Sequence, residues 1–497
     1  MMCRKKWCNF QTTLYSHALS PMKTTRFLRA LSGFALIALP VVAIAAPQPP
    51  PFRAGAAASN ITPALGCSLN GGFQDRKATH VHDELHARCL VLDDGQARLA
   101  IVVVDSCVVQ RAIMDDAKRQ VKEATGLPLE NILISATHAH SCPTATPVGQ
   151  SEPDPAYNKW LATRIADGVR RAVNNLAPAR IGWGCGEVPG QVFNRRWKMK
   201  PGTIPKNPFG GTNDLVQMNP GVGNPNLVEP AGPTDPQVWF ISVQSPEGRP
   251  VALLANYSLH YVGGVPGTTL SADYFGAFAD RIQELLGADR QDPPFVGIMS
   301  NGTSGDVNNI NFRGGQPPQP PYGQIRFVAN EVAQEVARVL KTIPHHDRVS
   351  LGSAQKEIPL GVRHASPAEL AKAREVMGRS RSFPRMDTME EVYAREAVLL
   401  SEFPPEMPAL LQVLKIGELH VCAIPAEVFV EIGLELKTKR KNLFTVSLAN
   451  GYNGYLPTPE QHQVAGYETW RARSAYLEVN ASRKIVATLT ELLGRLN

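Results

Sequence analysis

Two histidines separated by a single residue, His138 and His140, follow a short apolar segment at residues 132–135. Because side chains alternate along a β-strand, this H-x-H spacing at a strand end would place both imidazoles on one side. Taken alone, the pattern more often reflects capping or packing than metal binding. Two further candidate ligands, His260 and Glu427, also follow apolar segments. Neutral imidazoles and a carboxylate suit zinc, and a zinc site with an open position can activate water.

A second histidine-rich segment offers a competing metal site. It reads His80-x-His82-Asp83-x-x-His86 and precedes an apolar, strand-like segment. No pocket at a strand end is expected there, so we interpret these side chains as loop packing or as hydrogen-bond partners behind a metal site, and keep metal binding as the alternative.

The elements that must position these residues form a regular pattern of hairpins and helices. The predicted hairpins pair residues 85–92 with 99–104, 238–243 with 251–257, and 411–418 with 420–424. Further strands are predicted at 132–135 and 295–299, with a glycine-rich loop at 301–309. Predicted helices cover residues 112–125, 157–176, 277–286, 326–340, much of a charged insertion at about 366–402, and the last 20 residues.

Hairpins that alternate with helices predict a mixed α/β (α+β) fold, in which mixed or antiparallel sheets are flanked by helices. A doubly wound parallel sheet does not fit this pattern. The sequence shows no internal repeat. His138, His260 and Glu427 each follow a short apolar strand, which is the usual place for a site built on a rigid scaffold.

Composition excludes several classes of protein. The chain has 497 residues, of which 43% are hydrophobic and 19% charged, so it is neither disordered, coiled-coil nor collagen-like. Six basic residues and no acid among residues 1–45 account for most of the net charge of +7. The remainder is nearly neutral, so net charge gives no argument for nucleic acid or for an anionic membrane surface.

The N-terminal segment has the features of a secretory signal peptide. From Met22, basic residues precede an apolar run at residues 30–44, and the small residues around Ala45 predict cleavage near that position. The run is too short to span a membrane, and translation is expected to start at Met22 rather than Met1. We therefore expect a secreted or periplasmic protein, with residues 1–45 removed and residues 46–497 forming one domain without a transmembrane segment.

Six cysteines remain after this cleavage, and none lies in a C-x-x-C motif. An oxidising compartment permits disulfides, whereas several of these cysteines lie in apolar strand patterns that are typical of buried free thiols. Both alternatives stay open for Cys67, Cys89, Cys107, Cys142, Cys185 and Cys422.

Seven sequence segments, taken in order, resemble motifs of the neutral (non-lysosomal) ceramidase family. They read VHDELHARCLVLDDG, ILISATHAHSCP, VFNRRW, VALLANYSLH, SGDVNN, IPAEVFVEIG and NGYNGYLPTPEQHQVAGYE, and they run from about residue 53 to 470. The resemblance implies the fold of the family's catalytic domain. It also implies an exported zinc amidase that cleaves ceramide into a sphingoid base and a fatty acid with a zinc-activated water.

The resemblance also assigns the ligands of one catalytic zinc ion. His138 and His260 match the family's zinc histidines, Glu427 matches its acid, and Tyr455 takes the place of its tyrosine ligand. Tyr452 lies three residues earlier, and only the resemblance favours Tyr455 over it.

Three more residues match catalytic positions of the family. His140 resembles its proton-handling histidine, while Arg195 and Tyr467 match residues expected to bind the oxyanion that forms when an amide carbonyl is attacked. Cationic and hydroxyl donors at that position supply a large catalytic effect. Arg195 and Tyr467 could also be ordinary surface and packing residues.

The sequence departs from the family at a loop near the expected site. The family has a serine after its Gly-Asp-Val string, whereas Asn308 stands here after Asp306 and Val307, and Ser304 lies on the other side of the glycine. Asp306 and Asp273 are possible ligands of a structural Mg²⁺ or Ca²⁺, although carboxylates in such loops more often cap turns.

The chain ends 29 residues after Glu468, so we expect it to lack the family's C-terminal β-sandwich domain. Such a short, divergent member need not act on a sphingolipid. The expected partners are a lipid or small-molecule substrate and, peripherally, membrane lipid. The alternatives are a zinc-dependent esterase or deacetylase acting on acylated glycans or other small amides and esters, and a non-catalytic envelope binding protein on the same scaffold.

Overall fold

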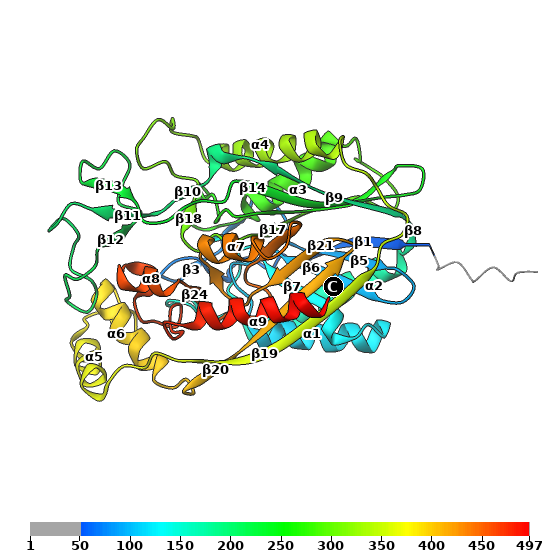
Figure 1. Ribbon diagram of the computed structural model, residues 1–497. Coiled ribbons are helices and arrows are strands. Elements are labelled where there is room, and N and C mark those ends of the chain that lie inside the picture. The colour runs from blue at the N-terminus through cyan, green and yellow to red at the C-terminus, as the bar shows by residue number, and fades with distance from the viewer. Residues whose placement is uncertain (1–50, 497) are drawn as a thin grey trace, which may run out of the picture. The chain divides into compact units, whose positions relative to one another are not determined.

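Each of the three predicted hairpins lies in a sheet whose four main strands follow the same topology, and the first sheet has the short strand β8 (Ala177–Pro178) as a fifth (Figure 1). The computed structural model describes residues 51–496, so the predicted signal peptide and its cleavage site lie outside the described residues. In each sheet an antiparallel strand precedes the hairpin, and a helix then leads to a fourth strand that pairs parallel with the second hairpin strand. A further helix packs on the first two strands.

We call these three segments the first, second and third repeat. The first comprises β1 (Arg53–Asn60), β5 (His86–Asp93), β6 (Arg98–Val104), α1 (Arg111–Thr125), β7 (Ile132–Ala136) and α2 (Pro155–Asn174). The second comprises β9 (Arg180–Glu187), β14 (Gln237–Gln244), β15 (Pro250–Tyr257), α3 (Asp273–Leu285), β17 (Val296–Asn301) and α4 (Gly323–Leu340). The third comprises β19 (Leu351–Gly361), β20 (Glu406–Ile416), β21 (Leu419–Ala423), α7 (Val430–Lys437), β23 (Leu443–Val446) and α9 (Ala481–Arg495).

Shorter elements fill the connections between these strands. Two helices occupy the predicted insertion, α5 (Pro367–Arg379) and α6 (Met389–Leu400), and α8 (Pro459–Gln463) precedes α9. Turns of 3₁₀ helix lie at Leu129–Asn131, Pro189–Gln191 and Tyr467–Thr469. The short strands are β2 (Ser68–Leu69), β3 (Arg76–Lys77), β4 (His80–Val81), β8 (Ala177–Pro178), β10 (Phe193–Asn194), β11 (Arg196–Met199), β12 (Val216–Met218), β13 (Leu227–Pro230), β16 (Thr269–Leu270), β18 (Val307–Asn308), β22 (Glu427–Val428) and β24 (Tyr455–Leu456).

The three sheets share one apolar core. Leu90 of β5, Ile241 of β14 and Leu414 of β20 belong to the same buried cluster, so side chains from all three repeats pack together. The opposite faces carry helices, with α2 on β1 and β5, α4 on β9 and β14, and α9 on β19 and β20 (Figure 1). The fold is therefore mixed α/β, as predicted.

The predicted hairpins and helices are present, with shifted ends. The helix α3 begins at Asp273, four residues before its predicted start, and α9 begins at Ala481. The repetition of topology was not detected in the sequence, because the repeats share strand order without sharing residues.

All six cysteines among the described residues are free thiols. Of the helices that the structure describes, none is both long and apolar enough to cross a bilayer.

A buried lysine on α1 ties the first repeat to the third. Lys118 is 3% exposed, and its Nζ donates a hydrogen bond of 2.8 Å to Oδ1 of Asn450. The backbone N–H of Asn450 donates to the carbonyl of Ile134, and its amide donates to Gln412. Burial lowers the pKa of Lys118 to about 8.

This shift predicts that stability rises with pH above neutrality. An unfolded lysine has a pKa of about 10.4, so between pH 8 and that value the unfolded state binds more protons than the folded state. The free energy of unfolding should increase by at most about 3 kcal/mol over this interval. Urea unfolding at pH 7.5 and pH 10 measures the change, and the Lys118→Met protein, which lacks the group, should show a smaller one. An equal change in both proteins would contradict the assignment.

Candidate metal centre

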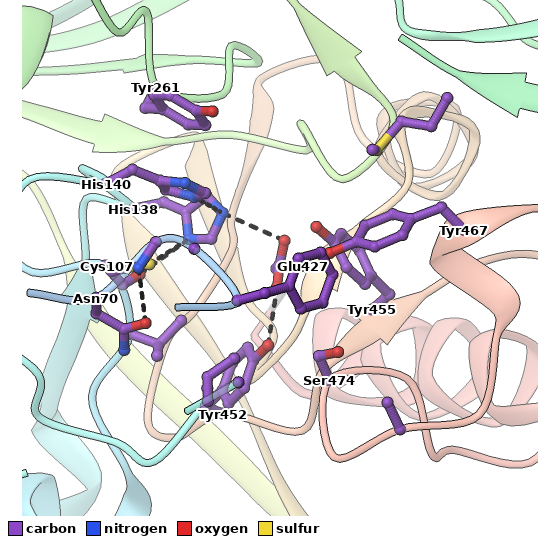
Figure 2. A pocket seen from close by; sticks show the side chains of 18 of the residues that line it. Asn70, Cys107, His138, His140, Tyr261, Glu427, Tyr452, Tyr455, Tyr467 and Ser474 are labelled. Carbon is purple, nitrogen blue, oxygen red and sulfur yellow. Dashed lines mark hydrogen bonds and ion pairs between the residues drawn. The ribbon is translucent and has the colours of Figure 1, made fainter. Parts of the chain in front are cut away.

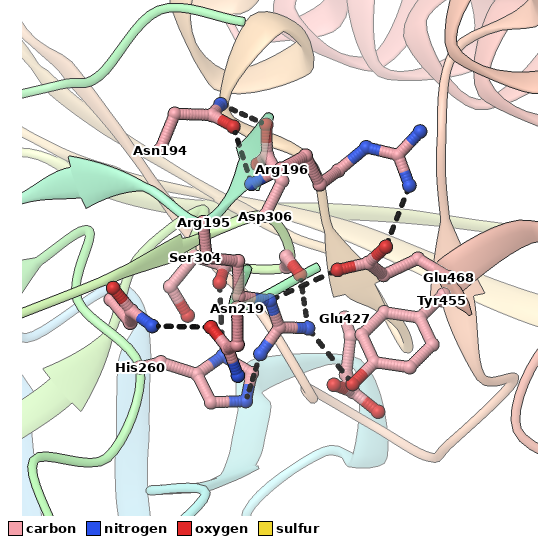
Figure 3. A network of polar contacts seen from close by, with 12 residues as sticks. Asn194, Arg195, Arg196, Asn219, His260, Ser304, Asp306, Glu427, Tyr455 and Glu468 are labelled. Atoms are coloured by element: carbon pink, nitrogen blue, oxygen red, sulfur yellow. Dashed lines mark hydrogen bonds and ion pairs between the residues drawn. The ribbon is translucent and has the colours of Figure 1, made fainter. Parts of the chain in front are cut away.

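The three predicted ligands from separate repeats lie together at one edge of the sheets (Figure 2, Figure 3). His138 follows β7, His260 follows β15, and Glu427 lies just beyond β21. Nε2 of His138 is 2.9 Å from Nε2 of His260 and 3.2 Å from Oε2 of Glu427. All three residues are buried, and their ligand atoms lie within 4.8 Å of one another.

Hydrogen bonds on the far side of each imidazole fix its tautomer. Nδ1 of His138 lies 2.9 Å from the carbonyl of Cys107, and Nδ1 of His260 lies 2.9 Å from the carbonyl of Ser304. Carbonyls can only accept, so each Nδ1 carries a proton, and Nε2 is the ring atom that can bind a cation when it is not protonated. Oε2 of Glu427 is buried and faces Nε2 of His138. Three electron-pair donors that face one another fit a divalent cation.

His138 and His140 converge for a different reason from the predicted strand alternation. The strand β7 ends at Ala136, and His138 has a left-handed backbone with φ of 74°. Such a conformation costs about 1–3 kcal/mol in a residue with a side chain and is typical of functional sites. It brings Nε2 of His140 to 3.1 Å from Nε2 of His138, while the His140 ring stacks on Tyr261 at 3.7 Å.

The electrostatics of the cluster favour one positive charge. Burial disfavours protonation of His138, but the charge of Glu427 and other neighbouring groups together raise the pKa of His138 to about 10. Burial raises the pKa of Glu427, but the charge and hydrogen bond of His138, together with Arg195 and Tyr452, lower it below the usual value. Burial, then neighbouring positive charge, holds the pKa values of His140 and His260 well below the usual range, so both stay neutral. Neutral imidazole is the form that binds metals.

Arg195, between β10 and β11, lies directly beside this cluster (Figure 3). It is 4% exposed, and its Nη1 is 3.2 Å from Nε2 of His260. Nη2 donates to the carbonyl of Gly305 at 2.8 Å and to the hydroxyl of Tyr455 at 3.1 Å. The guanidinium is therefore held in one orientation next to the candidate ligands.

One buried carboxylate holds two consecutive arginines. Oε1 of Glu468 accepts from Nε of Arg195 at 3.0 Å, and Oε2 accepts from Nη1 of Arg196 at 2.6 Å. Glu468 and Arg196 are fully buried. Removing one partner of such a buried ionic group leaves an uncompensated charge, which is strongly destabilising. Glu468 was not predicted as a site residue, although it directly follows Tyr467.

Two tyrosines approach Glu427 in different ways. The parallel pairing of β22 with β24 places Tyr455 opposite Glu427, and the hydroxyl of Tyr455 contacts Arg195. The hydroxyl of Tyr452 donates to Oε1 of Glu427 at 2.9 Å. Burial raises the pKa of both phenols well above the usual value, which favours their neutral form. The choice of Tyr455 as a ligand stays a prediction.

The cluster opens into a cavity of about 240 Å³. Tyr467 forms part of its wall and packs edge-on to Tyr455, with ring centroids 5.9 Å apart. Gly71 lies against His140 with φ of 105°, and a Cβ there would be 2.5 Å from Cβ of His140, so only glycine fits.

Cys107 also lines the cavity and forms a second possible metal-binding group with His138 and His140. Cys107 was not predicted, although it lies close after β6 and the strand-end rule could have identified it.

Comparison with known proteins shows the family to which the chain belongs. A family model described as neutral/alkaline non-lysosomal ceramidase, N-terminal, matches residues 52–319, which is more than half of the chain. The chain belongs to this ceramidase family. The resemblance found in the sequence is thereby confirmed.

Individual ceramidases are similar over parts of the chain. A neutral ceramidase of Mycobacterium tuberculosis (strain ATCC 25618 / H37Rv) is 27% identical over 158 residues, which cover 29% of this chain and 24% of that protein. The crystal structure of the neutral ceramidase from Pseudomonas aeruginosa has a TM-score of 0.68 at 16% identity, covering 90% of this chain and 74% of that one. A structure of a ceramidase complexed with C2 gives the same TM-score and identity. At this identity the structural likeness shows the shared fold.

Two residues predicted near the site lie behind it. Asp306 is fully buried, and its oxygens accept from the backbone N–H of Val430 and the amide of Asn194, both at 2.9 Å. Asn308 donates to the side chain of Asn219, which lines the cavity. Both residues thus support the loop around the site, and neither lines the cavity.

The other predicted cation ligands serve as local structure. The oxygens of Asp273 accept backbone N–H groups of Val262 and Gly263, in the loop after β15, and of Tyr274 in α3, which agrees with a capping role. His82 of the competing cluster stacks on Tyr322 with centroids 3.6 Å apart, and Asp83 accepts from Ser271. These contacts agree with the packing interpretation of this cluster.

We expect the His138→Ala and His260→Ala proteins to lose zinc binding, because each removes one of three facing donors. The zinc content of each protein is measured by mass spectrometry after loading with zinc and dialysis. The wild-type chain should retain one zinc ion. His82→Ala, in the competing cluster, is the matched control and should retain the same content. Unchanged zinc in both cavity variants would rule out this metal centre.

Proposed function

We propose that this chain is a zinc-dependent amidase that hydrolyses the N-acyl bond of a ceramide-type lipid. The observation that carries the proposal is the set of three facing donor atoms on His138, His260 and Glu427, of which His138 and Glu427 line a cavity. Membership of the ceramidase family supports the amide substrate. Tyr455 would complete the ligand set. A zinc ion bound there lowers the pKa of a water molecule to about 7, which permits attack on a carbonyl carbon at neutral pH.

Two donors are placed to stabilise the oxyanion that forms on the attacked carbonyl. Arg195 keeps its charge: burial lowers its pKa, but Tyr455 and Glu468 together raise it above the ordinary value. Tyr467 presents a neutral phenol to the same cavity, since burial raises its pKa. Fixed donors in a dry cavity stabilise developing negative charge without having to reorganise.

His140 is suited to transfer the proton. Its imidazole is neutral at physiological pH, and its Nε2 points toward the cluster. It can accept a proton from the attacking water and deliver it to the departing amine nitrogen. Hydrolysis then ends with the hydroxyl on the acyl carbon and the proton on nitrogen, giving a fatty acid and a sphingoid base.

The size of the cavity favours a second candidate substrate class. A volume of about 240 Å³ lies below the ~300–1,000 Å³ of usual ligand pockets. It accommodates the scissile group and a few neighbouring atoms, so long chains must extend outside it. The same site would therefore serve a short acyl group, as in acetylated glycans or other small amides and esters.

We further propose that the protein acts outside the cytoplasm, secreted or in the periplasm. The basic and apolar segments from Met22 to Ala45 support export. The family match begins at residue 52, shortly after the predicted cleavage site, which agrees with a removable leader.

A substrate screen tests the proposal. The purified chain, loaded with zinc, should release sphingoid base from a fluorescent N-acyl sphingosine, and a chelator should abolish the release. Turnover of acetylated sugars alone would select the second candidate. Absence of both activities in the zinc-loaded chain would refute the amidase and the esterase together.

Tyr467→Phe should lower kcat by about 10²-fold with little change in KM, as loss of one oxyanion donor does. Steady-state kinetics measure both constants. Tyr393→Phe is the matched control, because Tyr393 belongs to the same aromatic cluster and does not line the cavity. Equal turnover of Tyr467→Phe and wild type would leave Tyr467 with a packing role only.

A further inference from the structure

The α5–α6 insertion and the neighbouring segment around Phe209 expose large apolar side chains. Phe383 is 66% exposed, and Met389, at the start of α6, is 40% exposed. Phe209, 40% exposed, packs edge-on against Tyr393 of α6, with ring centroids 5.7 Å apart. Exposed apolar residues that gather in one region mark an interaction site more often than single ones do.

The loop between α5 and α6 is locally basic. From Lys372 to Arg385 there are five basic residues and one acid. Arg379 pairs with Glu375 on its own helix, and Arg385 pairs with Asp387 at the exposed surface. Arg381 has no acidic partner among the described residues. The segment thus combines an exposed aromatic ring with exposed cationic side chains, although the body of the chain is nearly neutral.

Hydrogen bonds attach this loop to the rim of the catalytic cavity. The carbonyl of Met386 accepts from the side-chain amides of Gln74 and Gln150, both at 2.8 Å, and its N–H donates to Gln150 at 2.7 Å. Gln74 and Gln150 directly follow Phe73 and Gly149, which line the cavity. Phe383 is therefore three residues from a fixed point at the cavity rim.

A buried ion pair fastens α6 to the same rim. Glu396 lines the cavity and is 4% exposed, and its carboxylate pairs with Arg473 at 2.6 Å. Arg473 and Arg395 both donate to the carbonyl of Gly149. The insertion is joined to the cavity wall at two places. A membrane that binds the loop would therefore also fix the position of the cavity mouth relative to the membrane.

We propose that residues 379–389 are an interfacial anchor that inserts Phe383 into an anionic lipid bilayer, with Arg379, Arg381 and Arg385 at the headgroups. Aromatic rings bury well at the acyl boundary, and arginines near the surface are attracted by anionic lipids. The anchor would hold the cavity mouth at the membrane, where an N-acyl lipid can enter with its chains still in the bilayer. This benefit to catalysis rests on the proposed function, whereas the binding does not.

Vesicle binding of the full chain tests the anchor directly. Phosphatidylcholine vesicles with and without phosphatidylglycerol are sedimented with the wild type, Phe383→Ser, Arg381→Glu and the matched control Phe327→Ser. Phe327 is 47% exposed on α4, which packs on α3 and β9. Both loop variants should bind the anionic vesicles about tenfold more weakly, and the control should bind like the wild type. Equal binding by all four proteins would overturn the proposal.

Insertion of the ring itself is measured with Phe383→Trp, which leaves an aromatic residue in place. Brominated lipids should quench its fluorescence more than that of the wild type or of Phe327→Trp. This signal is independent of any membrane affinity of the N-terminal leader, since all the proteins share it. Quenching that is the same in all three proteins would show that the loop does not enter the bilayer.

Activity separates this inference from the proposed function. Phe383→Ser should hydrolyse N-acyl sphingosine in anionic vesicles about tenfold more slowly than the wild type and a soluble short-chain amide at the same rate. An equal loss on both substrates would overturn the anchor as a delivery device. If no protein hydrolyses either substrate, the amidase proposal fails, and the quenching result still decides on the anchor.

Discussion

Two imidazole lone pairs and one carboxylate oxygen face one another in a buried space, which is unfavourable unless a positive charge lies among them. Much of the surrounding structure maintains this arrangement. Carbonyls behind the rings fix each tautomer, Tyr452 holds the other oxygen of Glu427, and the backbone of His138 stays left-handed. The raised pKa of His138 also indicates that a positive charge is favoured at this position, next to Glu427. An ion in this place would satisfy all three donors at once.

The threefold repetition of the sheet explains where these atoms meet. In each repeat a helix connects two parallel neighbouring strands, so both strands end at the same edge of their sheet. His138, His260 and Glu427 each follow one of these strand ends. Ligand sites in α/β sheets form outside the carboxyl ends of strands. The shared apolar core brings the three edges together, and each repeat contributes one donor.

Local patterns predicted the hairpins, most helices and the three donors, because periodicity and turn residues act over short distances. Other features depend on tertiary structure. The parallel pairing of β7, β17 and β23, and the sharing of Glu468 by Arg195 and Arg196, join residues far apart in sequence. Strand alternation gave the wrong reason for the convergence of His138 and His140. Net charge averaged over the chain also concealed the local excess around Arg381.

The order of the donors along the chain has a consequence for biosynthesis. His138 and His260 leave the ribosome well before Glu427, and Tyr455 and Tyr467 come later still. A nascent chain with two complete repeats has the imidazoles without the carboxylate that balances a cation between them. The three-donor cluster therefore cannot assemble until the final third of the polypeptide has been synthesised and folded.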